Sequence, residues 1–350
     1  MRDYFNFNAG PAMLPYEVIL RAREEIFDFK GTNISPLEIG HRSAEFQELL
    51  VTITNKLKNL LNVPNNYKII YLQGGAQAGF CMLPFYYRQE NKSYDYISSG
   101  FWSDKAIKSA KKYGNVNIIK LGSDKLIFNK DSIYGYMCMN ETANGIMFKD
   151  FENPYNIPII NDMTSCITTL NIDISKFGII YAASQKNLGI PGLTMYIVRD
   201  DLIETQNKLI PEVFNFKLQY EQHSTLNTIS TYSFYIMDLM LDWIYDKGGV
   251  VKLEQEAKLK SNLIYDYIDS NDFYQNNIDV QFRSEINVVF NLKNTDLIAK
   301  FIHESKEAHL LNIKGHLAVG GVRVSLYNAL PIEGVHLLLS FMEEFRKKNS

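Results

Sequence analysis

Short apolar runs alternate with longer amphipathic segments between residues 67 and 198, and this alternation constrains the fold more than any other feature of the chain. The runs that predict strands are Tyr67–Leu72, Tyr94–Ser98, Val116–Leu121, Tyr134–Met139, Ile157–Ile160, Phe177–Ala183 and Leu193–Val198. Ala76–Arg88 and Asp104–Tyr113 predict helices between them. Strands that are apolar on both faces belong in a sheet covered by helices on both sides. The alternation therefore predicts an α/β domain built on such a sheet.

Helical periodicity marks the regions on either side of these strands. Apolar residues recur every three or four positions from Ala44 to Leu61, where Val63-Pro64-Asn65-Asn66 ends the predicted helix. Two long helices are predicted over Ile229–Tyr245 and Val250–Ser270. The segments after them predict strands at Asp279–Phe282, Asn287–Leu292 and Gly321–Leu326, and helices at Thr295–His309 and Gly334–Lys347. We expect a second, smaller α+β domain, with the boundary inside the second long helix, near residue 258.

Charge and composition exclude several classes of partner. The 36 Lys and Arg residues nearly balance the 39 Asp and Glu residues, which gives a net charge of −3 and no basic excess for nucleic acid or an anionic membrane surface. No apolar run approaches the roughly 18 residues that span a bilayer, and the amino terminus has no signal-peptide core. The three cysteines lack Cys-x-x-Cys spacing, which argues against a disulfide framework or a metal site. The sequence predicts a cytoplasmic protein with a small-molecule partner.

Three predicted strand ends carry residues that point to one chemistry. Gln73-Gly74-Gly75-Ala76-Gln77 leads into a helix, where free backbone N–H groups suit a phosphate, although two glycines alone favour a simple tight turn. Asp162 closes a buried strand, where it either caps a helix, pairs with a cation or meets a protonated ring nitrogen. Lys186 lies between two predicted buried strands, a position that is rare for lysine unless it is paired with an anion or has a function. The alternative is a lysine in a solvent-exposed turn.

Together, these features match one cofactor. A phosphate cup, a carboxylate for a pyridinium nitrogen and a lysine for covalent attachment are the parts that proteins supply to pyridoxal 5′-phosphate. Asp162 precedes Lys186 by 24 positions, enough for one crossover between neighbouring strands. The combination is far more specific than any of its members.

Ordered matches along the whole chain carry a resemblance. They are Phe5-Asn6-Phe7, Gly10-Pro11-Ala12-Met13-Leu14-Pro15, Gly40-His41-Arg42-Ser43, Gly100-Phe101-Trp102, Asn140-Glu141-Thr142, Ser184-Gln185-Lys186-Asn187, Asn227-Thr228, Lys314-Gly315-His316, Gly320-Gly321-Val322-Arg323 and Leu326-Tyr327-Asn328-Ala329. The sequence resembles the phosphoserine aminotransferases, homodimeric fold-type-I enzymes that use pyridoxal phosphate. The resemblance implies a large domain over residues 16–258, with a mainly parallel seven-stranded sheet flanked by helices. It also implies a small α+β domain that joins residues 1–15 to 259–350.

The resemblance assigns roles at the cofactor ring. Lys186 would bind the cofactor covalently and then move a proton on the substrate, while Asp162 would keep the ring nitrogen protonated. Trp102 would stack on the ring and Thr142 would hydrogen-bond near it. Taken alone, Trp102 reads as a core residue and Thr142 as a turn or cap residue.

The resemblance also assigns the residues that would bind the cofactor phosphate. The backbone of Ala76 and Gln77 and the side chain of Gln185 would hold it, and Asn227 and Thr228 would reach it from the neighbouring subunit. Without the resemblance, Asn-Thr before a helix is an N-cap.

Substrate binding is assigned to four further residues. Arg323 lies in an apolar strand pattern, where an inward arginine requires an anion such as a substrate carboxylate. His41, Arg42 and His316 match the pocket that the family uses for the substrate phosphate, although an exposed His-Arg pair is usually a solvated surface feature. Two positions depart from the family pattern, since Gln77 and Leu317 stand where arginines are usual.

The resemblance implies transamination between O-phosphoserine with 2-oxoglutarate and 3-phosphohydroxypyruvate with glutamate, in serine biosynthesis and in a second role in vitamin B6 synthesis. Gln77 and Leu317 motivate the nearest alternative, a related aminotransferase with an unphosphorylated amino donor. Another alternative is a cofactor-binding interaction partner without turnover. The joint presence of Lys186, Asp162 and Arg323 argues against that class.

Overall fold

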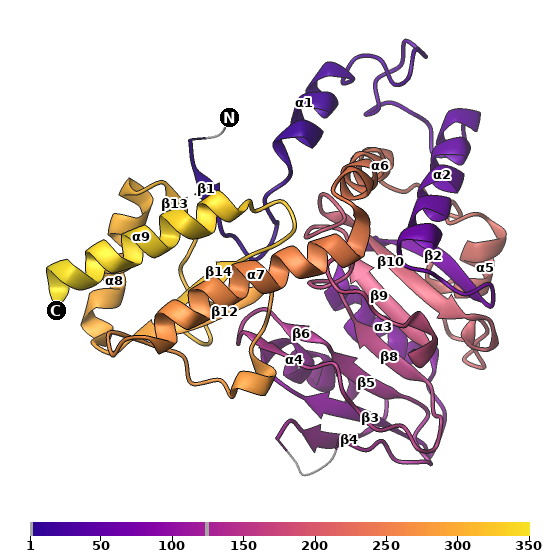
Figure 1. Ribbon diagram of the computed structural model, residues 1–350. Coiled ribbons are helices and arrows are strands. Elements are labelled where there is room, and N and C mark those ends of the chain that lie inside the picture. The colour runs from indigo at the N-terminus through magenta and orange to yellow at the C-terminus, as the bar shows by residue number, and fades with distance from the viewer. Residues whose placement is uncertain (1–2, 123–125) are drawn as a thin grey trace.

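The computed structural model describes residues 3–122 and 126–350, and within these residues the largest sheet has seven strands (Figure 1). In spatial order the strands are β2 (Tyr67–Gly74), β10 (Gly192–Arg199), β9 (Ile179–Ala183), β8 (Ile159–Asp162), β5 (Gly135–Cys138), β3 (Ser93–Ser98) and β4 (Asn115–Lys120). Only β10 runs against its neighbours β2 and β9, and the other pairings in this sheet are parallel. The predicted mainly parallel sheet is confirmed.

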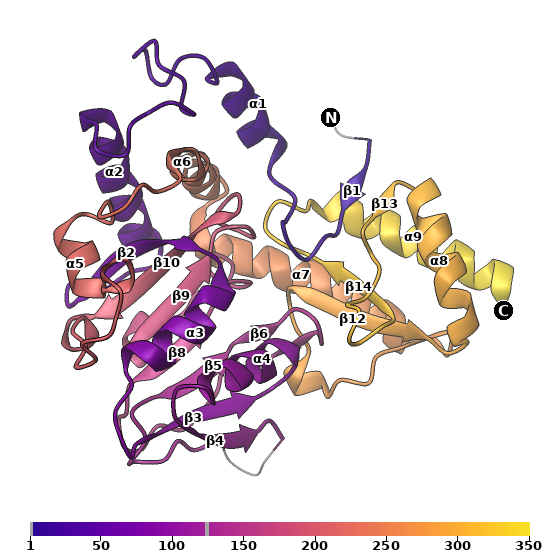
Figure 2. The ribbon, with the colours of Figure 1, turned by 180° about the vertical axis from the view of Figure 1, so that it is seen from behind.

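The two faces of the sheet are covered by different helices, as the sequence predicts (Figure 2). Alternate residues of β2 show the division, because Ile70 and Leu72 join the core on one face while Ile69 and Tyr71 join the core on the other. The first face packs against α3 (Ala76–Tyr86), α4 (Phe101–Ala110) and α5 (Phe216–Glu221). The second face packs against α2 (Ala44–Leu60) and α6 (Thr231–Asp246).

The amino-terminal part of the large domain contains one helix that the periodicity did not predict, α1 (Tyr16–Glu24). The predicted helix after it is confirmed as α2, whose first turn is capped by the Ser43 side chain accepting from the Phe46 N–H at 3.2 Å. In Figures 1 and 2, α1 and the loop that leads to α2 stand out beyond the sheet. Phe27 in this projecting segment is 84% exposed.

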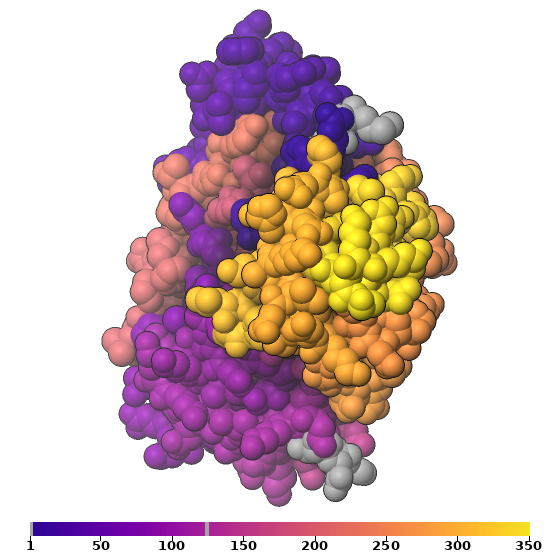
Figure 3. All heavy atoms as spheres, turned by 90° about the vertical axis from the view of Figure 1, so that its left-hand side faces the viewer, coloured from indigo at the N-terminus to yellow at the C-terminus, as the bar shows by residue number. Residues whose placement is uncertain are grey.

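A second core lies in the carboxyl-terminal part of the chain. Its elements are α7 (Gly249–Asp269), β11 (Tyr274–Gln275), β12 (Asn287–Leu292), α8 (Ile298–Glu307), β13 (Leu310–Leu311), β14 (Val322–Ser325) and α9 (Ile332–Asn349). The amino-terminal strand β1 (Phe5–Asn6) pairs in parallel with β13. Figure 3 shows this unit lying against the large sheet domain.

Helix α7 belongs to both cores. Val250 and Leu253 pack in the core of the large sheet, whereas Ile264 and Ile268 pack in the second core. This division supports the predicted domain boundary near residue 258, which stays a prediction, as does the discontinuous small domain. Residues 1 and 2 of that predicted domain lie outside the described residues.

The strand expected at Asp279–Phe282 is wrong. Val280–Phe282 forms a short 3₁₀ helix instead, and Val280 is 76% exposed. The neighbouring strand β12 has no free edge for it, because β11 and β14 lie on its two sides. The other 3₁₀ helices of the described residues are Ile174–Lys176, Asp200–Leu202, Glu212–Phe214 and Thr295–Leu297, the last of which precedes α8.

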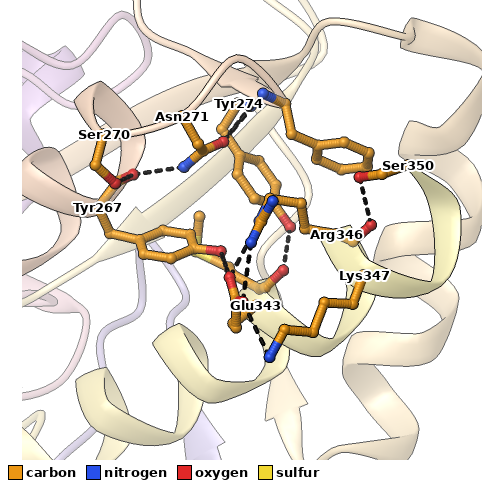
Figure 4. A network of polar contacts seen from close by, with 10 residues as sticks. Tyr267, Ser270, Asn271, Tyr274, Glu343, Arg346, Lys347 and Ser350 are labelled. Carbon is orange, nitrogen blue, oxygen red and sulfur yellow. Dashed lines mark hydrogen bonds and ion pairs between the residues drawn. The ribbon is translucent and has the colours of Figure 1, made fainter.

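Polar contacts fasten α9 to the rest of the small unit (Figure 4). The Glu343 carboxylate accepts the Tyr267 hydroxyl of α7 at 2.8 Å and pairs with Arg346 at 2.9 Å. The Tyr274 hydroxyl donates to the Met342 carbonyl at 2.7 Å. The carboxyl-terminal helix is therefore an integral part of the second core.

Within the described part of the chain, no helix has the length and apolar character that crossing a membrane requires.

Candidate active site

A cavity of about 660 Å³ opens where the parallel strands end and the small unit begins. The carboxyl ends of β2, β5, β8 and β9 meet at this edge, because parallel strands end on the same side of a sheet. The predicted site residues that line the cavity are Ala76, Gln77, Trp102, Thr142, Asp162, Gln185, Lys186, His316 and Arg323. Segments far apart in the sequence are thus brought to one place.

Asp162 and Lys186 form the buried floor of the cavity. Asp162 ends β8 and is 5% exposed, and Lys186 follows β9 and is 9% exposed. Burial raises the pKa of Asp162 above its ordinary value. The opposing influences are hydrogen bonds from Thr164 and Tyr181 and the positive charge of Lys186. A buried carboxylate close to an amine is an arrangement for handling protons.

A chain of tyrosine hydroxyls lies behind Asp162, and sequence reasoning missed it. The Tyr181 hydroxyl donates to Asp162 Oδ2 at 3.1 Å and lies 2.8 Å from the Tyr136 hydroxyl. Thr164 N–H donates to the other carboxylate oxygen at 2.9 Å. Tyr181 is the register partner of Asp162 on β9. The available signal was a tyrosine inside an otherwise apolar predicted strand.

The amino terminus of α3 can hold an anion. Its N-cap, Gly75, has no side chain to satisfy the first N–H groups of the helix, and the Ala76 and Gln77 N–H groups belong to that first turn. Gly74 has a φ of +132°, which favours glycine in the turn that aims this helix at the cavity. Gln185 lines the same cavity.

A buried carboxylate fixes the start of α4, and this too was missed. Glu141, in the short strand β6 (Asn140–Glu141) that pairs with β7 (Ile146–Met147), accepts from the Trp102 N–H at 2.8 Å and the Ser103 N–H at 2.7 Å. Burial raises the pKa of Glu141. Because a distant side chain caps the helix, α4 begins at Phe101, earlier than the predicted Asp104.

Trp102 and Thr142 are bonded to each other beside the cavity. The indole Nε1–H donates to Thr142 Oγ1 at 2.9 Å. This bond fixes the orientation of the indole on one wall of the cavity. The Lys105 ammonium lies 5.5 Å from the centroid of the same ring.

The outer side of the cavity is cationic. Arg323 on β14 donates from Nη1 to the Thr142 carbonyl at 3.2 Å, and its buried Nε has no partner among the described residues. Burial lowers the pKa of Arg323. The pKa of His316 is also lowered, first by burial and then by the charges of Arg323 and Lys105. An arginine with an unused buried donor is suited to a carboxylate ligand.

Four predicted site residues do not line this cavity: His41, Arg42, Asn227 and Thr228. They lie on the side of α2 and the segment before α6, where Arg42 Nη2 lies 3.5 Å from the Leu226 carbonyl. Asn227 Oδ1 accepts from Gln219 at 3.1 Å. The buried Nε2 of His41 has no hydrogen-bond partner among the described residues.

Comparisons with known proteins give matches along nearly the whole chain. The family model of class-V aminotransferases matches residues 4–338. A phosphoserine aminotransferase of Acinetobacter baylyi is 41% identical over 360 residues, which cover 100% of both chains. A solved phosphoserine aminotransferase from Bacillus circulans subsp. alkalophilus covers 99% of both chains at 36% identity, with a TM-score of 0.95. A phosphoserine aminotransferase from Trichomonas vaginalis, solved with pyridoxal phosphate bound, is 32% identical with a TM-score of 0.91 and covers 97% of this chain and 99% of its own.

Proposed function

The chain belongs to the class-V aminotransferase family and, within it, to the phosphoserine aminotransferases, and from this premise we propose that its cavity exchanges an amino group between O-phosphoserine and 2-oxoglutarate. The products are 3-phosphohydroxypyruvate and glutamate, and the reaction serves serine biosynthesis. The observation that carries this function is the meeting of Lys186, Asp162 and Arg323 in one cavity. The cytoplasmic location stays a prediction.

The donor set of the cavity fits pyridoxal phosphate. Lys186 offers an amine for covalent attachment, Asp162 a buried carboxylate for the ring nitrogen, and the first turn of α3 a set of free N–H groups for the phosphate. Trp102 would bind the ring, with Thr142 beside it. When bound, the cofactor supplies an electron-withdrawing ring that stabilises negative charge at the α-carbon of the substrate.

The residues of the chain supply the remaining chemistry. Arg323 binds the α-carboxylate through its unused donor and thereby orients the α-carbon toward Lys186. Lys186 Nζ would remove the proton from the α-carbon of the substrate as a general base and then deliver it as a general acid. Asp162 would keep a proton on the ring nitrogen of the cofactor, and the hydrogen bonds from Tyr181 and Thr164 stabilise the charged form of Asp162.

We further propose a homodimer in which each cavity is completed by the other subunit. His41, Arg42, Asn227 and Thr228 would serve the cavity of the neighbouring copy, where the cofactor phosphate and the substrate phosphate need donors. The projecting segment before α2 supports this arrangement, because Phe27 (84%) and Leu37 (58%) are exposed apolar side chains without a function in one chain. Sedimentation of the purified protein is expected to give twice the chain mass, and a monomer would refute the proposal.

A substrate panel tests the function. Glutamate added to the purified protein should convert the absorbance of the bound cofactor to that of its aminated form, and O-phosphoserine should do the same at lower concentration. An unchanged spectrum with both amino acids would disprove transamination. A higher kcat/KM for serine or alanine than for O-phosphoserine would instead favour the alternative aminotransferase with an unphosphorylated donor.

A further inference from the structure

We propose that Lys105 is a substrate-binding residue that gives this cavity its preference for a phosphate over a carboxylate at the distal end of the substrate. The inference rests on the proposed function and assigns a residue that no part of the motif pattern identified. It concerns the outer rim of the cavity, where α4 meets the loop that carries His316.

Lys105 is held at this rim by aromatic side chains. Its ammonium lies 5.9 Å from the Phe101 ring centroid and 5.5 Å from that of Trp102. The same rings pack against His316, with centroids 4.3 Å away for Phe101 and 6.2 Å away for Trp102. Trp102 and His316 line the cavity, so Lys105 is one side chain away from it.

The charge of Lys105 is not neutralised by a neighbour. Within residues 3–122 and 126–350 it forms no ion pair, and the adjacent carboxylate of Asp104 accepts from the Ser98 hydroxyl at 2.6 Å. Its charge reaches the site, because the pKa of His316 is lowered first by burial and then by the charges of Arg323 and Lys105. An unpaired ammonium beside a histidine attracts an anion placed between or above them.

Within one chain, the described residues that line the cavity offer the distal phosphate little positive charge. Of the described lining residues, Lys186 is committed to the cofactor and Arg323 to the α-carboxylate. Gln77 is neutral, and Leu317, next to His316, is apolar and 95% exposed. A phosphate group near neutral pH carries about −1.5 to −2 charges and a side-chain carboxylate only one. Lys105, beside His316, is therefore the cation of this chain that remains to meet that excess charge.

The alternative is a lysine that only packs its stem on aromatic rings. Substitution of such a lysine would change the stability of the protein and would affect the binding of every amino-acid substrate to the same extent. The test must therefore separate charge from packing and phosphate from carboxylate.

Steady-state kinetics of Lys105→Met, Lys105→Arg and the exposed control Lys108→Met, with O-phosphoserine and with glutamate, make that separation. In Lys105→Met we expect the KM for O-phosphoserine to rise about 10-fold, the effect of one charge-assisted hydrogen bond, and the KM for glutamate by less than about 3-fold. We expect kcat to stay within about 2-fold, because Lys105 does not act on the reacting atoms. Lys105→Arg should restore the KM for O-phosphoserine, and Lys108→Met should match the unaltered protein.

A second measurement uses inorganic phosphate as a competitive inhibitor of the glutamate reaction. Its inhibition constant should rise about 10-fold in Lys105→Met and remain unchanged in Lys108→Met. Equal KM changes for both amino acids, no change for either, or failure of arginine to restore binding would each overturn the proposal. If the unaltered protein does not turn over O-phosphoserine at all, the proposed function fails, which is a different outcome from a Lys105 variant that behaves like the parent.

Discussion

The inner and outer halves of the cavity differ in how deeply their residues are buried and in which elements supply them. Inner residues such as Asp162 and Lys186 follow buried strands, are at most 9% exposed and lie among fixed neighbours. Outer residues come from a helix start, a loop and the small unit, and here Arg323 has an unused donor and Leu317 is 95% exposed. We therefore propose that the inner half determines the reaction and the outer half determines which substrate is accepted. The variants below test that division.

Lys186→Ala should have the largest effect. Removing the amine that takes and returns the proton should lower kcat by about 10⁴-fold. Circular dichroism should show an unchanged fold, since a smaller side chain facing a cavity leaves no unsatisfied group. Lys176→Ala, an exposed lysine at the opposite end of β9, is the control and should keep full activity. A Lys186→Ala enzyme with even a tenth of the parental kcat would remove Lys186 from the mechanism.

Asp162→Asn should separate catalysis from stability. Losing the charge that holds the proton on the ring nitrogen should lower kcat about 100-fold with a smaller change in KM, the effect of one charge-assisted hydrogen bond. Burial raises the folded-state pKa of Asp162, so the ionised group costs stability above its ordinary pKa. The cofactor-free variant should therefore melt at the same or a higher temperature. A lower melting temperature together with unchanged kcat would show that Asp162 is structural.

Arg323→Lys belongs to the outer half and should change binding more than rate. A lysine keeps the charge and loses the forked donor, so the KM for both amino acids should rise about 10-fold with kcat nearly unchanged. A fall in kcat that equals the rise in KM would contradict the division, because it would place Arg323 with the inner residues.

The inner half was largely predictable from the sequence and the outer half was not. Apolar strands covered on both faces have a strong periodic signal, and the residues that end them, Asp162 and Lys186, lie where a parallel sheet collects its ligands. Local patterns could not reveal the capping of α4 by Glu141 or the Tyr181 hydroxyl behind Asp162. Each depends on partners that are distant in sequence.

Dependence on distant partners also explains why the roles of some residues stay predictions. His41, Arg42, Asn227 and Thr228 were assigned through the resemblance, and within one chain they lie outside the cavity. Lys105 had no signal of its own, because a lysine in the first half of an amphipathic helix reads as a solvated residue. Its position beside His316 depends on how α4 meets the small unit.

The smallest expected effect is a pH dependence in the outer half. The pKa of His316 lies below its ordinary value, so the ring is neutral at pH 8 and becomes cationic as the pH falls through that lowered pKa. The KM for glutamate, whose side-chain carboxylate stays ionised down to about pH 5, should therefore fall about 3-fold on the acid side, a modest gain because the site is partly solvated. His316→Gln should abolish this inflection. Lys105→Met removes a repelling charge and should move the inflection to higher pH; an unmoved inflection would mean that the two side chains do not share one anion site.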